Sequence, residues 1–269
     1  MTAPLDSPQL RPITLTDIVE AIDAGIRDFR QAPKYGLVLG GLYAAAGWLM
    51  IALLWHLGMP YFAYPLAMGF ALIAPFAATG FYAVSEHLER GKPLSWAAVL
   101  GAVRETSKRE LRWMALVSGF ALVIWMDIAA FVLFASSNFT MINAESLKNL
   151  VTTPTGWMFV ILGNAAGAIL AFSVFSISAI SFPMLYDREV DFVTAMVSSV
   201  KLVIASPRAM IGWCIFIAIC MVLSLITAFL GLFLAMPVIG HATWHLYRRA
   251  VVPVPVTSKP PTDLKLAKV

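Results

Sequence analysis

The sequence predicts an all-α membrane protein, a polytopic helix bundle of six transmembrane helices with three cytoplasmic amphipathic helices. Composition is the first reason, because 60% of the residues are hydrophobic and 13% are charged, against roughly 25% charged in a soluble domain. The second reason is the stretch 209–247, which contains no Asp, Glu, Lys or Arg. As one helix it would be roughly 60 Å long, about twice the hydrocarbon thickness, so we expect two crossings with a break near residues 224–231.

One integral membrane domain is expected at residues 16–249, between polar tails at 1–15 and 250–269. The first tail lacks the basic and apolar regions of a signal peptide, and the second combines prolines with scattered lysines, which is typical of disorder. Long uncharged or nearly uncharged runs predict the spans. These spans are residues 35–57, 61–83, 113–134, 157–182, 209–226 and 229–247.

Each pair of predicted spans follows a segment with helical apolar periodicity, at residues 16–32, 94–109 and 190–205. The apolar stripes are formed by Ile18, Ile22, Ile26 and Phe29, by Trp96, Val99, Leu100 and Val103, and by Val193, Met196, Val197, Val200 and Ile204. Ser95 and Asp191 can cap the second and third of these helices. This recurrence indicates a threefold parallel repeat of one amphipathic helix and two spans.

The returning span of each repeat contains a proline toward its cytoplasmic end. These prolines are Pro75, Pro183 and Pro237, and each is followed by a tyrosine and an arginine: Tyr82 and Arg90, Tyr186 and Arg188, Tyr247 and Arg248. A proline inside a helix leaves the carbonyl four residues earlier without its usual donor, so we expect kinks at the three positions.

The distribution of basic residues predicts the orientation. With six spans, 18 of the 19 Lys and Arg residues lie on the side of the termini, and Lys148 alone lies on the other side. The positive-inside rule then places both termini in the cytoplasm. The basic residues flank the hydrophobic spans and form no continuous run, so the pI of about 9.1 does not indicate nucleic-acid binding.

Asp127 is the one acidic residue inside a predicted span, and about 21 Å of helix separates it from Trp113 at the inner interface. An aspartate at that depth costs roughly 3 kcal/mol, so we expect it to face the bundle interior or to be protonated. Asn164 on the next span is its expected partner. The pair is interpreted either as a proton or cation relay or as a hydrogen bond that joins two helices.

Three sequence blocks resemble a bacterial integral membrane family, the domain of unknown function 2189. They are GFYAVSEHLERGKPLS at residues 80–95, PMLYDREVDF at 183–192 with Ala195, and PVIGHATWHLY at 237–247. The resemblance covers most of the chain from Tyr35 to Arg249. It implies a multi-pass protein of the bacterial cytoplasmic (inner) membrane without an established activity, and it supplies no catalytic residues.

Members of that family are sometimes labelled as similar to cytochrome c oxidase subunit I. A haem-copper catalytic subunit needs about six histidine ligands, and this chain has four histidines. The label therefore fails as a catalytic assignment. A single haem or metal held by His87, His241 and His245 is the remaining hypothesis, against the interpretation of these residues as hydrogen-bonded interfacial histidines.

Three functional classes follow from the sequence. The preferred one is a non-catalytic structural, accessory or assembly component of a membrane complex, of which a respiratory complex is one example. The alternatives are a small transporter that uses Asp127, and a haem-binding or metal-binding redox protein that uses the three histidines. No catalytic motif is present in the sequence, no cofactor is expected, and the expected partners are the lipid bilayer and another membrane protein.

Overall fold

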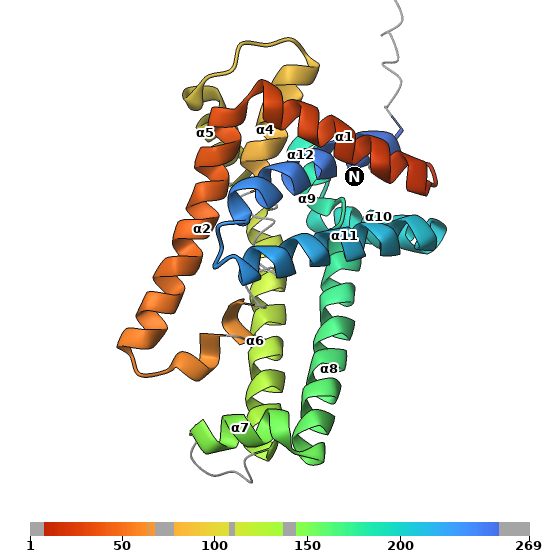
Figure 1. Cartoon of the computed structure of the whole chain (residues 1–269). Coiled ribbons are helices and arrows are strands. Elements are labelled where there is room, and N and C mark those ends of the chain that lie inside the picture. The colour runs from red at the N-terminus through yellow and green to blue at the C-terminus, as the bar shows by residue number, and fades with distance from the viewer. Residues whose placement is uncertain (1–7, 64, 68–77, 108–110, 137–143, 253–269) are drawn as a thin grey trace, which may run out of the picture.

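The computed structural model describes residues 8–63, 65–67, 78–107, 111–136 and 144–252 (Figure 1). These residues form helices and no β-strand, which confirms the predicted all-α class. The helices are α1 (Leu15–Gln31), α2 (Pro33–His56), the short 3-10 helix η1 (Pro60–Phe62), α4 (Thr79–Glu89), α5 (Trp96–Ser107), α6 (Leu111–Ser136), α7 (Ala144–Thr152), α8 (Pro154–Ser178), α9 (Ser181–Asp187), α10 (Phe192–Ala205), α11 (Pro207–Ile226) and α12 (Leu232–Ala250).

Four helical segments are long and apolar enough to cross a membrane. They are Pro33–His56, Arg112–Val132, Pro154–Asp187 and Pro207–Ile226, and they match the first, third, fourth and fifth predicted spans. Residues 64 and 68–77 of the second predicted span, 61–83, lie outside the described residues. The sixth is represented by α12, which is less apolar because its last three turns carry two histidines and two arginines. Six spans therefore remain a prediction.

Short-range sequence signals set many of the helix ends. Thr14 begins α1 with a capping box, in which its hydroxyl accepts from the Asp17 N–H and the Asp17 carboxylate accepts from the Thr14 N–H. Ser95 accepts from the Ala98 N–H ahead of α5, and proline occupies the first turn of α2, α8 and α11. The hairpin break expected near residues 224–231 is confirmed, since α11 ends at Ile226 and α12 begins at Leu232.

Asp191 caps α10, and its replacement gives a first testable prediction. Its carboxylate accepts hydrogen bonds from the hydroxyl and the backbone N–H of Thr194, and these bonds hold the pKa of Asp191 below the ordinary aspartate value. Asp191→Ala should destabilise the protein by about 1 kcal/mol at neutral pH. Because the folded pKa is depressed, the contribution is complete above the unfolded pKa and decreases as pH falls through the folded pKa. Thermal unfolding at neutral and acidic pH checks this, and Asp191→Asn should retain most of the stability.

α12 is the helix around which the core forms, and α1 and α2 pack against it (Figure 1). Glycines permit this close approach. A Cβ at Gly25 of α1 would lie 2.7 Å from the backbone nitrogen of Ala242, and one at Gly40 of α2 would lie 2.9 Å from the carbonyl oxygen of Leu232. Trp244 and Tyr247 of α12 are fully buried in the resulting core.

α6 and α8 run side by side, away from this core (Figure 1). A Cβ at Gly163 would meet the Val132 side chain, and one at Gly167 would meet the Trp125 ring, so these two glycines lie in the contact between the helices. The Trp125 indole donates to the carbonyl oxygen of Pro65 at 2.6 Å and ties α6 to the segment after α2. The outer surfaces of α6 and α8 are largely exposed.

Several expectations about local structure need correction. The segment 135–155, which lies between the third and fourth predicted spans and was expected to be a loop, contains α7. Residues 9–11, expected in the N-terminal tail, pair with residues 250–252, where the Arg11 N–H donates to the Ala250 carbonyl at 2.8 Å and Leu10 forms a β-bridge with Val251.

The three predicted kinks differ in outcome. Pro75 lies outside the described residues. Pro183 follows the interruption between α8 and α9, whereas α12 continues through Pro237 without a break.

Candidate functional site

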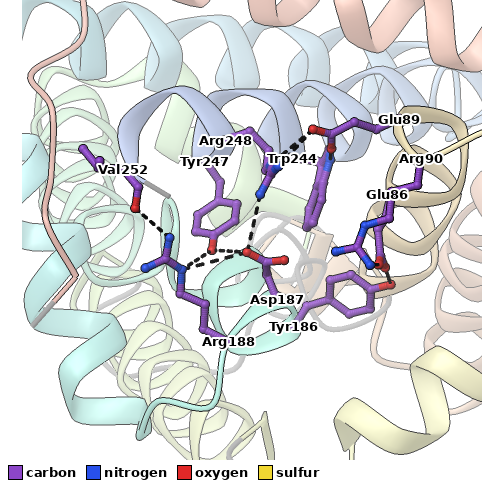
Figure 2. A network of polar contacts seen from close by, with 10 residues as sticks. All are labelled: Glu86, Glu89, Arg90, Tyr186, Asp187, Arg188, Trp244, Tyr247, Arg248 and Val252. Atoms are coloured by element: carbon purple, nitrogen blue, oxygen red, sulfur yellow. Dashed lines mark hydrogen bonds and ion pairs between the residues drawn. The ribbon is translucent and has the colours of Figure 1, made fainter. Parts of the chain in front are cut away.

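A polar junction joins the ends of α4, α9 and α12 (Figure 2). These are the three segments in which the sequence repeats a tyrosine followed by an arginine. Their aromatic side chains form one layer, in which the Tyr82, Tyr186 and Trp244 rings lie 5.6–6.4 Å apart. The charged residues that follow on each helix are thereby brought to one place.

Asp187 lies at the centre of the junction. Its Oδ2 atom accepts a 2.6 Å hydrogen bond from the Tyr247 hydroxyl and lies 3.9 Å from Arg188 and 3.8 Å from Arg248. Arg188 Nε donates to the Tyr247 hydroxyl at 3.1 Å, and its guanidinium also donates to the Val252 carbonyl. The carboxylate therefore joins the end of α9 to the last turn of α12.

Two further carboxylates on α4 complete the junction. Glu89 accepts from the Trp244 indole at 3.1 Å and from two guanidinium nitrogens of Arg248 at 3.1 and 3.2 Å. Glu86 accepts a short hydrogen bond from the Tyr186 hydroxyl and pairs with Arg90 at 2.7 Å. Figure 2 shows each carboxylate aimed at its partners.

The junction is electrostatically balanced. Three carboxylates, those of Glu86, Glu89 and Asp187, face three guanidinium groups, one each at the ends of α4, α9 and α12. Paired groups of this kind have little capacity to bind an additional ion or to act as a free acid or base. The arrangement is chemically suited to holding helix ends together.

The histidines proposed as a metal set do not share a site. His87 Nδ1 lies 2.8 Å from the Ala83 carbonyl, and His245 Nε2 lies 2.7 Å from Asp28 Oδ2. His241 is fully buried against the Ser85 hydroxyl at 2.8 Å. Among the described residues no three His, Cys, Asp or Glu side chains could hold a metal ion. The three side chains are thus directed to three different partners.

Asp127 does not face the bundle interior, because its side chain is exposed on α6. Trp125 lies in the contact with α8, and Asp127 follows two positions later, about 200° around the helix. It therefore points away from α8, and within the described part of the chain it has no hydrogen bond or ion pair. Asn164 is exposed on α8, where its amide donates to the Val160 carbonyl.

The pairing partners in the junction are the residues that sequence patterns did not reveal. Glu86 and Glu89 lie between the second and third predicted spans. Asp28, which pairs with His245 outside the junction, lies beside a predicted apolar stripe. One signal was available, since Glu86 and Arg90 are four residues apart in a helix, a spacing that favours an ion pair. No comparable signal links Asp28 to His245, which is 217 positions away.

Several long apolar helices around a buried core define the chain as a polytopic integral membrane protein. Residues 63–187 match the family described as "Predicted integral membrane protein (DUF2189)", which confirms the expected resemblance. The match includes the block at 80–95 and the start of that at 183–192, and it ends before the third block. Nothing in it supports the oxidase label. No curated protein and no solved structure matches the chain.

Proposed function

We propose that the protein is a non-catalytic accessory or assembly component of a membrane complex and that α6 docks against a partner within the bilayer. The outward position of Asp127 carries the proposal. The residue lies in the middle of an exposed stripe of large apolar side chains on α6, formed by Leu116, Phe120, Val123, Phe131 and Phe134. This chain therefore leaves a carboxyl group facing the surroundings of a membrane-spanning helix.

Exposure to lipid is costly for such a group. A carboxyl group near the bilayer centre costs roughly 3 kcal/mol on insertion scales, and intramembrane polar side chains usually face protein or a water-filled cavity. A partner helix that offers a hydrogen-bond donor at the same depth removes much of this cost.

The favoured partner is a different membrane protein with a basic, hydroxyl or amide side chain at that depth. A second copy placed symmetrically on the stripe would bring two Asp127 carboxyl groups together, and like charges at close range are unfavourable. The three phenylalanines of the stripe provide apolar contact area around the acid, and aromatic anchors of this type are common in interfaces.

The proposal includes six spans in the bacterial inner membrane, with both termini in the cytoplasm and a threefold repeat. The connections between amphipathic helix and span support the repeat. Ala32 between α1 and α2 has φ −130° and ψ 52°, and Ser206 between α10 and α11 has φ −137° and ψ 54°. Both residues precede the proline that begins the next helix, and both N–H groups bond to the carbonyl four residues earlier.

The packing of the amphipathic helices supports the repeat as well. α5 packs on α4 and α10 packs on α9, so each lies against the returning segment of the preceding repeat. α1 has no preceding repeat, and it packs on α12, the returning helix of the last one. This order of contacts is the one expected of three repeats in a ring.

The two alternative functions have weaker support. An internal relay needs Asp127 to face a pathway through the bundle, whereas its side chain points outward. A redox centre at the three histidines needs them to converge on one atom, and their hydrogen bonds direct them to three different partners.

Photo-crosslinking in native membranes tests the docking proposal. A photoreactive amino acid at Val123 or Phe131, which flank Asp127 on the stripe, should yield one discrete adduct with another membrane protein. Asp127→Leu should reduce that adduct several-fold, because it removes the hydrogen bond while retaining a membrane-compatible side chain. Mass spectrometry then identifies the partner.

Ile219 provides the matched control position, since it is 54% exposed on α11, a helix without an acidic residue. Crosslinks at Ile219 should be to lipid or diffuse. Adducts of twice the chain mass at Val123 would indicate a self-dimer. A self-dimer would contradict docking of a different protein at α6. Equal crosslinking yields at Val123, Phe131 and Ile219 would contradict it as well.

A further inference from the structure

α10 differs from a helix packed on a soluble core in its outward face, which is apolar as well as the face turned toward the protein. The face turned toward the protein contains Ser198 and Ser199, of which Ser199 is fully buried, together with Ala195, Leu202 and Val203. The outward face carries apolar side chains, with Val193 48%, Val197 45% and Ile204 73% exposed. Apolar groups on the outside indicate an apolar surrounding for this face.

α1 occupies the corresponding position in the first repeat and provides the contrast. From Glu20 onward its outward face carries Glu20, Asp23, Arg27 and Arg30, whereas the exposed Leu15 and Val19 lie nearer its start. Small residues such as Ala21 and Gly25 face the protein. Such a charged face is suited to water. The two helices are equivalent in order along the chain, but α10 has exposed apolar side chains from Val193 to Ile204, whereas those of α1 are confined to its first half.

Basic residues accompany the apolar side chains on the outer face of α10. Lys201 lies between Val197 and Ile204 on that face, and Arg208 follows one turn later at the start of α11; both are exposed. Neither forms an ion pair with a described residue. Long basic side chains beside apolar ones can extend to lipid phosphates while their alkyl stems remain in the apolar region.

The start of α10 lies at the level of an aromatic and basic anchor on α6. The Phe192 ring stacks on Trp113 at 5.8 Å, and the Arg112 guanidinium lies 5.7 Å from the centre of the Trp113 ring. Trp113 begins the hydrophobic run of α6 and is 43% exposed. Tryptophan with arginine at the end of a span is typical of the headgroup region. Figure 1 shows α10 lying across the end of α8, as a helix in the plane of that region would.

We propose that the outer face of α10, formed by Val193, Val197, Lys201 and Ile204, is together with Arg208 at the start of α11 a binding surface for anionic phospholipids of the cytoplasmic leaflet. The apolar side chains enter the region of the first acyl carbons, and Lys201 and Arg208 bind the phosphates. Binding at this surface holds α10 at a defined depth in the membrane. Because Ser199 of α10 contacts the start of α9, the end of α8 is held at that depth as well. The Ser199 hydroxyl, 3.4 Å from the Ile180 N–H, makes that connection.

Site-specific fluorescence on the full chain tests the proposal. In a Cys214→Ala, Cys220→Ala background, Val197→Cys carries an environment-sensitive dye, and Asp23→Cys on the outer face of α1 carries the same dye as control. The protein is reconstituted in phosphatidylcholine vesicles that contain nitroxide-labelled phosphatidylglycerol or nitroxide-labelled phosphatidylcholine. We expect strong lipid quenching at Val197 and little at Asp23, with a clear excess of quenching by phosphatidylglycerol.

Charge variants test the headgroup preference separately. Each basic residue near an anionic surface contributes roughly a five-fold preference, so Lys201→Gln and Arg208→Gln should each lower the phosphatidylglycerol enrichment by about that factor. Arg27→Gln on α1 should leave it unchanged. Water-like emission at Val197 equal to that at Asp23 would overturn the membrane assignment. Quenching at Val197 that is the same for both labelled lipids, or unaffected by either charge variant, would overturn the anionic preference.

Discussion

Gly25→Ala is expected to lower the thermal midpoint of the detergent-solubilised protein by roughly 5 °C. The added Cβ would lie 2.7 Å from the Ala242 nitrogen and 3.0 Å from the Val238 carbonyl oxygen. Both atoms belong to the backbone of α12 and cannot rotate away, so α1 must move from the helix on which it packs. Overpacking of this kind costs about 1–3 kcal/mol, which exceeds the gain in helix propensity of at most about 1 kcal/mol, and each kcal/mol corresponds to about 2–4 °C in a protein of this size. Gly25→Val should at least double the shift.

Gly101→Ala is the matched control. Gly101 is also a helical glycine, in α5, but no atom lies within 4 Å of the position that an added Cβ would take. The substitution should therefore leave the thermal midpoint unchanged or raise it by up to about 3 °C through helix propensity. Size-exclusion chromatography after heating measures both variants. Equal shifts for the two glycines would show that the contact between α1 and α12 is not close in solution.

The sequence predicted helix positions well where local chemistry determines them. Capping residues such as Thr14 and Asp191, and prolines such as Pro33 and Pro207, act within one helical turn, so the starts of α1, α2, α10 and α11 fall within two residues of expectation. The break between α11 and α12 followed from length alone, because one crossing cannot accommodate the uncharged run.

The direction of each helix face was harder to predict, since it depends on distant contacts. In α1 the predicted stripe of Ile22, Ile26 and Phe29 is half-buried, whereas the face that packs on α12 contains Ala21, Ala24, Gly25 and Asp28. Hydropathy gives such small residues little weight, although they permit the closest backbone approach. In α10 most of the predicted apolar stripe points outward for a different reason, namely that a membrane protein can place apolar groups on its surface.

Only part of the polar junction could be predicted from the sequence, because its pairs also depend on distant contacts. The repeated tyrosine and arginine residues were visible in the sequence, and the structure brings them together. Their carboxylate partners were not, because Asp187 pairs with Tyr247, 60 positions away, and Glu89 pairs with Arg248, 159 positions away. No periodicity within one helix encodes such pairs. For Asp127, the helical rise predicts how far along the helix the residue lies from Trp113. The direction of its side chain depends on which face of α6 contacts α8, and the sequence does not give that face.

Asp187→Ala should be among the most destabilising single substitutions in the polar junction. It removes the acceptor of the Tyr247 hydroxyl and the acid that Arg188 and Arg248 share, in a place where the Asp187 and Arg188 side chains are only 13% and 16% exposed. Removing one partner of a largely buried pair leaves charges without compensation, which costs about 3–5 kcal/mol when burial is complete. Because Arg248 retains Glu89 and is 37% exposed, we expect about 2–3 kcal/mol here, a decrease of roughly 5–10 °C in the thermal midpoint.

Glu20→Ala separates this effect from a general loss of charge. Glu20 pairs with Arg249 at 3.3 Å, but its side chain is 57% exposed, so its removal should change stability by less than about 0.5 kcal/mol. Asp187→Asn tests the mechanism, since it keeps an acceptor for Tyr247 and loses the charge, and it should fall between the wild type and Asp187→Ala. If Asp187→Ala and Glu20→Ala destabilise equally, the junction contributes no more than an exposed ion pair. A large difference would mean that the ends of α9 and α12 depend on the one carboxylate that accepts from the Tyr247 hydroxyl and faces Arg188 and Arg248.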